Sequence, residues 1–237
     1  MKKILTLTLI TLLNLSLNAQ SLLPIKYGIK AGANIANVTS IPNSGVENIN
    51  SSSLIGIAGG LYMEVPVNEK WYLNPEIIYI QKGAAFTYSY IHDYGINQRD
   101  LHNTSHELKL DYIELNSTIS YKTANKLSLN FGPSFSYLAT INYTILSDIG
   151  EDSNEASSHE LLPDGEYEEE TLDISLNLGM SYYLTEDFLI DGRVNTGLIS
   201  IGKVSKEIYT GSPGNDTKLN IYDLKNKGIV FSIAYLF

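Results

Sequence analysis

The 237-residue chain contains no cysteine, a single tryptophan and few basic residues. The lack of cysteine excludes disulfides, a lipoprotein anchor on a cysteine and any zinc site with thiolate ligands. The 16 lysines and arginines are outnumbered by 26 aspartates and glutamates. This balance argues against a nucleic-acid partner, because phosphates require a basic surface. After Gln20 the chain also lacks any stretch of the ~18 uncharged apolar residues that a transmembrane helix requires. A membrane crossing by the rest of the chain would therefore use strands.

The first 19 residues have the pattern of a secretory signal peptide. Lys2 and Lys3 precede an apolar run over residues 4–17, and a plausible cleavage site follows Ala19. A retained helical anchor is the alternative, but the run is too short to cross a bilayer comfortably. Residues 20–237 show no repeat period and no linker, and we therefore expect one domain.

An alternation of apolar and polar residues recurs along residues 20–237. In the segment from Ile229 to Phe237 every odd position is large and apolar, so these side chains share one face of a strand. In residues 127–145 the odd positions are apolar or aromatic, and the even positions are small and polar except for Leu138. Further strands are predicted at 27–36, 54–65, 71–88, 107–122, 171–184 and 188–198.

Two of these strands depart from strict alternation. In 71–88, Ile78 and Ile80 share a face with polar residues, among them Glu76. In 107–122 the pattern changes phase between Tyr112 and Ile113, which predicts a β-bulge in that strand.

The connectors between the eight predicted strands alternate in length. They are long at 37–53, 89–106, 146–170 and 199–217, and short at 66–70, 123–125 and 185–187. This alternation is typical of outer-membrane barrels, which have long extracellular loops and short periplasmic turns. Aromatic residues beside the short turns predict an interfacial girdle: Trp71, Tyr72, Tyr121, Tyr182, Tyr183, Phe188 and Phe237. The expected fold is all-β, an eight-stranded antiparallel transmembrane β-barrel over residues 20–237, in the cell outer membrane. A soluble lipocalin-like barrel is the alternative, but it explains neither the connectors nor the strand lengths.

The interior of an eight-stranded barrel is filled by side chains, so we expect no open pore. Six ionisable residues fall on the face assigned to the interior: Lys30, Glu76, Glu114, Asp173, Asp191 and Arg193. Charges away from water need partners. We expect Arg193 to be the main cation for Glu76 and Glu114, with Lys30 as a further counter-ion. A structural plug of ion pairs is the favoured interpretation, and a proton or ion relay is the alternative.

Half of the acidic residues, 13 of 26, lie between Asp148 and Asp187. A possible cation-binding acidic loop is formed by Glu151, Asp152, Glu166, Glu168, Glu169 and Glu170. Such carboxylates bind Ca²⁺ or bridge through divalent cations to lipopolysaccharide, but no calcium-loop spacing is present, and a solvated acidic loop is the alternative.

The four histidines, His92, His102, His106 and His159, fall in predicted loops. His102 and His106 could share a metal only if their loop were helical, so no metal site and no cofactor is predicted.

Four segments resemble the strand signatures of the PorT-like outer-membrane β-barrel family of Bacteroidetes: Tyr27–Asn34, Leu73–Gly83, Asp111–Leu115 and Phe131–Pro133. The chain departs from that family at Asn116, where proline is common. The resemblance implies insertion by the barrel-assembly machinery, which reads a C-terminal aromatic strand, here with Phe231, Tyr235 and Phe237 as the assembly signal. It implies no single activity, although a few members are tied to type IX secretion.

The functional expectation is a non-enzymatic barrel with a closed lumen, which has a structural or interaction role at the cell surface or assists a secretion complex. Its expected partners are outer-membrane lipid or lipopolysaccharide and a surface or secretion-complex protein. A narrow transporter of a small or apolar solute is the main alternative. An enzyme with its site at the outer rim is a weaker one.

Overall fold

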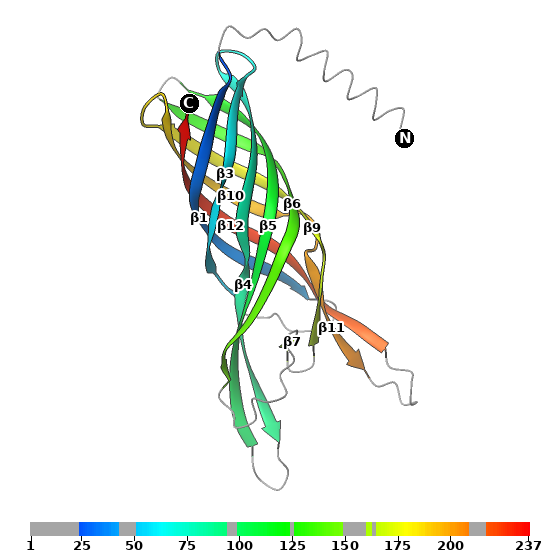
Figure 1. Cartoon of the computed structure of the whole chain (residues 1–237). Coiled ribbons are helices and arrows are strands. Elements are labelled where there is room, and N and C mark those ends of the chain that lie inside the picture. Colours follow the sequence, from blue (N-terminus) through cyan, green and yellow to red (C-terminus); the bar gives the residue numbers. More distant parts are fainter. Residues whose placement is uncertain are drawn as a thin grey trace, which may run out of the picture.

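Eight long antiparallel strands form a ring in the computed structural model of the chain (Figure 1). The structure describes residues 24–42, 51–93, 99–123, 126–148, 160–162, 165–208 and 217–237. The ring strands are β1 (Lys26–Pro42), β3 (Leu54–Pro66), β4 (Trp71–Asp93), β5 (Arg99–Lys122), β6 (Leu127–Asp148), β9 (Leu172–Tyr183), β10 (Phe188–Gly197) and β12 (Thr217–Leu236). Each ring strand pairs with its neighbours in this order, and β1 pairs with β12 from Gly28–Leu236 to Pro42–Tyr222. The eight strands predicted from the sequence are thus all present.

Three short turns lie at the end of the barrel that also carries the C-terminus (Figure 1). They connect β3 to β4, β5 to β6 and β9 to β10. Side chains close two of them: Asn68 Oδ1 accepts hydrogen bonds from the backbone N–H groups of Lys70 and Trp71, and Thr185 Oγ1 accepts one from Phe188. Short turns mark the periplasmic end of an outer-membrane barrel.

No helix in the described residues is long and apolar enough to span a membrane.

The alternation of side chains separates an apolar outer surface from a mainly polar interior. On β12, Phe231 and Ile233 point outward and are each 56% exposed, whereas Ser232 and Ala234 between them are buried. The same alternation holds on β9, where Leu178 and Met180 are exposed and Asn177 is buried. An exposed apolar face over a polar interior is the reverse of a soluble barrel, and it matches the predicted membrane barrel.

The β-bulge lies in β6, so its prediction in β5 is wrong. Asp111 of β5 pairs with Thr140, and the next residue, Tyr112, pairs with Leu138, which leaves Ala139 as the extra residue. Even positions of β5 face inward on both sides of this point. The bulge reverses the faces of β6, so the prediction of one continuous outward apolar face over 127–145 is wrong beyond Ala139. The apparent phase change in β5 instead marks a change of interior from apolar to polar.

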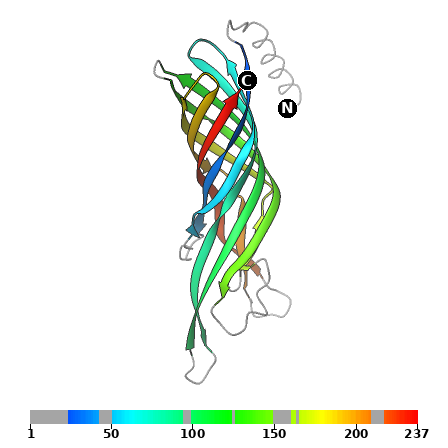
Figure 2. The ribbon, with the colours of Figure 1, turned by 60° about the vertical axis from the view of Figure 1, so that its left-hand side comes forward.

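The strands continue beyond the apolar surface, so the four long connectors are partly strand. β4 and β5 pair along their whole lengths, as far as Asp93–Arg99, and form a long hairpin (Figure 2). The other connectors contain β2 (Ser51–Ser52), β7 (Glu160–Leu162), β8 (Gly165–Glu169) and β11 (Gly202–Ile208). β11 pairs with the outer half of β12 and with β8, which extends the sheet sideways from the ring. Neither face of these strand segments is in contact with lipid, so polar side chains are compatible with both faces.

Candidate functional site: a two-layer plug inside the barrel

Seven charged side chains meet halfway along the barrel, and we call them the ionic layer: Lys30, Glu76, Lys82, Glu114, Asp173, Asp191 and Arg193. All seven are at most 6% exposed. Six of them are the residues that the sequence placed in the interior. The layer holds three cations and four carboxylates, so it carries one excess formal negative charge.

One half of the ionic layer is organised around Glu76. Lys30 Nζ lies 2.7 Å from Glu76 Oε1 and 3.0 Å from Asp191 Oδ1. Arg193 Nη1 donates to Glu76 Oε2 at 2.8 Å, and Asn116 Nδ2 donates to the same oxygen. Glu76 of β4 is therefore paired with two cations, Lys30 of β1 and Arg193 of β10. These strands are far apart in the sequence, and their side chains meet in the lumen.

The other half is organised around Lys82, which the sequence interpretation missed. Lys82 Nζ lies 2.7 Å from Glu114 Oε2 and 2.9 Å from Asp173 Oδ2. Arg193 approaches Glu114 only to 3.9 Å, and its buried Nε has no hydrogen-bond partner among the described residues. The expectation that Arg193 is the main cation for Glu114 is therefore wrong. Lys82 and Glu76 are both at even positions of β4, so the two-residue alternation places them on the same face. This signal could have assigned Lys82 to the interior.

Neutral polar side chains complete the ionic layer. Asn130 Nδ2 donates to Asp191 Oδ2 and to Ser181 Oγ, and Asn226 Nδ2 donates to Asp173 Oδ2 at 3.0 Å. A cavity beside Lys30, Glu76 and Arg193 has a volume of about 10 Å³. That space is about the size of one water molecule, so the side chains around Glu76 and Arg193 are closely packed.

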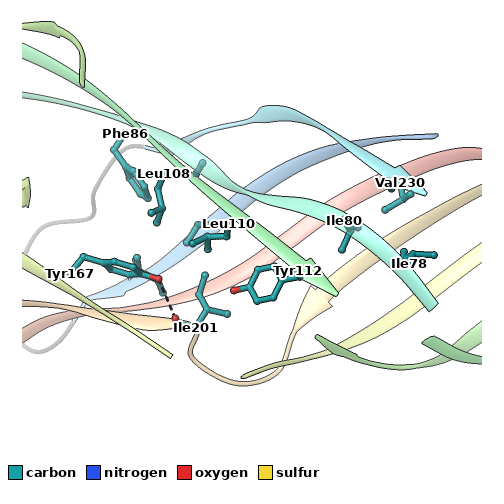
Figure 3. Close-up of a cluster of buried hydrophobic side chains, with 13 residues drawn as sticks. Ile78, Ile80, Phe86, Leu108, Leu110, Tyr112, Tyr167, Ile201 and Val230 are labelled. Atoms are coloured by element: carbon teal, nitrogen blue, oxygen red, sulfur yellow. Dashed lines mark hydrogen bonds between the residues drawn. The ribbon is translucent and has the colours of Figure 1, made fainter. Parts of the chain in front are cut away.

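A second, apolar layer begins at the level of the ionic layer and fills the barrel toward its extracellular end: on β4, Ile78 and Ile80 lie between Glu76 and Lys82, and Phe86 lies beyond Lys82. It consists of Val38, Ala58, Ile78, Ile80, Ala84, Phe86, Leu108, Leu110, Tyr112, Tyr167, Ile201, Leu224 and Val230, all buried (Figure 3). Leu138, Ile141 and Tyr143 pack against it from β6. Leu138 faces inward by the regular alternation, and the bulge at Ala139 places Ile141 and Tyr143 on the same side.

Two tyrosines connect this apolar layer to its surroundings. Lys82 Nζ lies 5.1 Å from the ring centroid of Tyr112, so the two layers are in contact. Tyr167, brought in by β8, donates a hydrogen bond to the carbonyl of Ile201 at 3.2 Å (Figure 3). Burial raises the pKa of the Tyr167 hydroxyl, which stays protonated and available to donate.

The periplasmic end of the lumen carries a third charged group. Lys122 Nζ lies 2.5 Å from Glu64 Oε1 and sits over the rings of Tyr72 and Tyr183, at 3.8 and 4.3 Å from their centroids. Tyr183 also donates a hydrogen bond to Glu64. Tyr72 and Tyr183 therefore face the lumen, and their assignment to the aromatic girdle is wrong. They border an open vestibule of about 640 Å³, which Lys26 also lines.

The remaining girdle residues lie on the outside of the barrel. Trp71 packs on Tyr121 with ring centroids 4.9 Å apart, and Phe188 packs on Tyr235 at 4.8 Å. The proposed assembly-signal residues Phe231, Tyr235 and Phe237 are 56%, 41% and 71% exposed, so all three face away from the lumen.

The acidic residues proposed as a cation site are only partly described. Glu151 and Asp152 lie outside the described residues, and Glu166 is described only as a backbone position in β8. Glu169 and Glu170 are exposed, and Glu168 pairs across the sheet with Lys203 of β11. Within the described part of the chain, no three His, Cys, Asp or Glu side chains are grouped to hold a metal ion.

The histidines differ from their predicted positions in loops. His92 lies on β4, and His102 and His106 lie on β5, so the helical loop that a metal pair would need is not formed. His106 is 2% exposed, and its Nδ1 is hydrogen-bonded to the hydroxyl of Tyr143. His159 lies outside the described residues.

Comparisons with known proteins identify the barrel. A family model described as "Outer membrane protein beta-barrel domain" matches residues 18–202. No curated protein matches the chain. Among solved structures, the chain is similar to Neisserial surface protein A, with 14% identity, a TM-score of 0.46, and coverage of 91% of this chain and 100% of that one. It is also similar to OprG from Pseudomonas aeruginosa, with 14% identity, a TM-score of 0.40, and coverage of 90% and 94%. The protease OmpT from Escherichia coli has 10% identity, a TM-score of 0.40, and coverage of 90% and 96%. Because the family model covers most of its length, the chain belongs to the outer membrane protein β-barrel domain family and is an outer-membrane protein.

Proposed function

We propose that this protein is a non-conducting, non-enzymatic barrel that carries its extracellular strands as a platform for a partner at the cell surface or in a secretion complex. The observation that carries the proposal is the two-layer plug. An ion that crossed the lumen would have to displace the ion pairs of Lys82 and Glu76. It would also have to pass the buried side chains of the apolar layer. Desolvating an ion in such a layer is costly, so conduction is disfavoured.

Planar-bilayer recording of refolded residues 20–237 tests this proposal. We expect no steady conductance from the wild-type protein. Insertion is checked separately by the heat-modifiable folded band of the protein recovered with the lipid, so that silence cannot come from a failure to insert. Steady wild-type conductance would refute the proposal in favour of a narrow path for a small solute.

The absence of an enzymatic role is also part of the proposal. His106 supports it, since this histidine is buried against Tyr143 and is not presented at the rim. A rim enzyme would instead draw on His92 or His159. Turnover of any substrate class that disappears when His92 is replaced by alanine, without loss of the folded band, would contradict a non-enzymatic role.

A role beside a secretion machine follows from the PorT-like resemblance, which we retain as part of the proposal. The hairpin of β4 and β5 and the side sheet of β11 and β8 support a docking role, because they extend folded backbone beyond the apolar surface. Cross-linking and co-purification from native membranes would test it. Recovery of a stoichiometric envelope protein that is lost when β11 is deleted would support docking, and recovery of the barrel alone would count against it.

A further inference from the structure

We propose that Lys225 and Lys227 on the outer face of β12 form a binding site for the phosphate groups of the phosphorylated glycolipid in the outer leaflet. This inference rests on the outer-membrane location and not on the proposed platform role. It also differs from a divalent bridge at the acidic residues, because it assigns the contact to cations of the protein itself.

The first argument is the position of the two lysines along β12. The outward residues from Ile229 to Phe237 are apolar and exposed, and Lys227 and Lys225 are the next two outward residues toward the extracellular end. Two residues of a strand span about 6.6 Å. The lysines therefore lie directly above the apolar belt, at the height where the charged groups of the outer leaflet begin.

The second argument is the chemistry around them. In the barrel ladder, Lys227 lies opposite Thr196 of β10 and Asn37 of β1, and Lys225 lies opposite Thr39. Thr39 and Thr196 are exposed, so two hydroxyl groups border the ammonium groups. A lysine ammonium and nearby hydroxyl donors are well suited to a phosphate.

The third argument is that the lysine charges are not used within the protein. Lys225 Nζ donates to the carbonyl of Leu198 at 2.9 Å, which leaves two of its three N–H donors. Among the described side chains, no carboxylate forms an ion pair with Lys225 or Lys227. Asp223, the next outward residue on β12, lies opposite Lys203 of β11, and Lys203 also lies opposite Glu168 of β8, so these charges are balanced farther from the belt.

The fourth argument is that the arrangement is local. On β4 and β5, the first polar outward residues above the belt are Gln81 and Asp111, which are hydrogen-bonded to each other at 3.1 Å. The next outward residue on β5 is Lys109, but it forms an ion pair with Glu107 at 2.7 Å, so its charge is already compensated within the protein. In a chain with an excess of acidic residues, the placement of two lysines at this level of one wall marks that wall as the lipid-phosphate contact.

Binding of lipid A to the refolded mature chain in non-ionic detergent, measured by native mass spectrometry, tests the proposal. We expect the double variant Lys225→Gln and Lys227→Gln to bind lipid A roughly 30-fold more weakly, from about 1 kcal/mol for each lysine. The variant with both lysines changed to arginine should keep most of the affinity. A matched control, Lys70→Gln with Lys126→Gln, removes the same charge at two exposed periplasmic turns and should bind as the wild type does.

Three results would overturn the assignment. Equal binding by the wild type and the glutamine variant, with both showing a heat-modifiable folded band, would exclude these lysines. Equal binding of dephosphorylated lipid A by the wild type would show that phosphate is not recognised. Competition by inorganic phosphate at the same concentration as lipid A would assign the site to a free anion instead of a lipid.

Discussion

Replacement of Lys82 by methionine should destabilise the barrel more than any other single change in the ionic layer. Methionine keeps the length of the side chain and removes its charge, so packing changes little. Glu114 would retain Ser136 and a distant Arg193 at 3.9 Å, and Asp173 would retain Asn226. The excess formal charge of the layer would rise from one to two negative charges in a volume closed to water.

The expected cost follows from the burial of the pair. Removing one partner of a buried ion pair costs roughly 3–5 kcal/mol, because the remaining charge is left uncompensated. We expect the lower part of this range, about 3 kcal/mol, since hydrogen bonds to both carboxylates remain. Arg193→Met should cost less than Lys82→Met, because Glu76 keeps Lys30 at 2.7 Å.

Urea unfolding of the refolded chain measures the effect. The fluorescence of Trp71, the only tryptophan, and the heat-modifiable gel band report the folded barrel, and the midpoint and slope give the free energy of unfolding. Lys109→Met is the matched control, because Lys109 forms an ion pair with Glu107 at 2.7 Å on the exposed surface. An exposed pair of this kind contributes less than about 1 kcal/mol.

A second substitution separates charge from packing. Glu114→Gln removes one of the two uncompensated carboxylates, so in the Lys82→Met background it should restore part of the lost stability. If Lys82→Met changes the free energy of unfolding no more than Lys109→Met does, the ionic layer is solvated and the plug is not closed. An additive, further loss in the double variant would show that the two side chains do not act as a pair.

Three further predictions concern the apolar layer, the bulge and the glycines. Leu110→Ala should lower the free energy of unfolding by about 2–5 kcal/mol, whereas the lipid-facing Leu129→Ala should cost less, because lipid fills the space and only the transfer free energy of the removed atoms is lost; an equal effect of the two in urea unfolding would contradict an apolar interior. Deletion of Ala139 joins Leu138 to Thr140 in the register that they already have with Tyr112 and Asp111, so Ile141 and Tyr143 should stay inward and the heat-modifiable band should be kept, and loss of the band would place the bulge elsewhere. Gly83 has a φ of 120° and a Cβ there would lie 1.9 Å from a backbone oxygen of β5, so Gly83→Ala should reduce folded yield on the gel, whereas Gly192→Ala meets only ordinary contacts at 3.5 Å and should fold normally.

The sequence by itself determined the number of ring strands and the faces along most of their length. The alternation of Leu178 and Met180 with Asn177 has a period of two, which is a property of the local backbone and needs no partner strand. The connector lengths added the orientation, since short turns gather at the periplasmic end. These signals also placed Glu76 and Arg193 in the interior.

The tertiary structure alone decided which interior residues meet. Lys82 reaches Asp173 across 91 positions of sequence, and this contact depends on the stagger of β4 against β9, which no local pattern encodes. The bulge at Ala139 could not be predicted from the sequence either. The apolar residues at the end of a strand have the same sequence pattern whether their side chains face lipid or the apolar layer inside the barrel. The odd or even position of a residue assigns its side chain to one face of a strand. Which side chains that face contacts is determined only by how the strands pair in the closed ring.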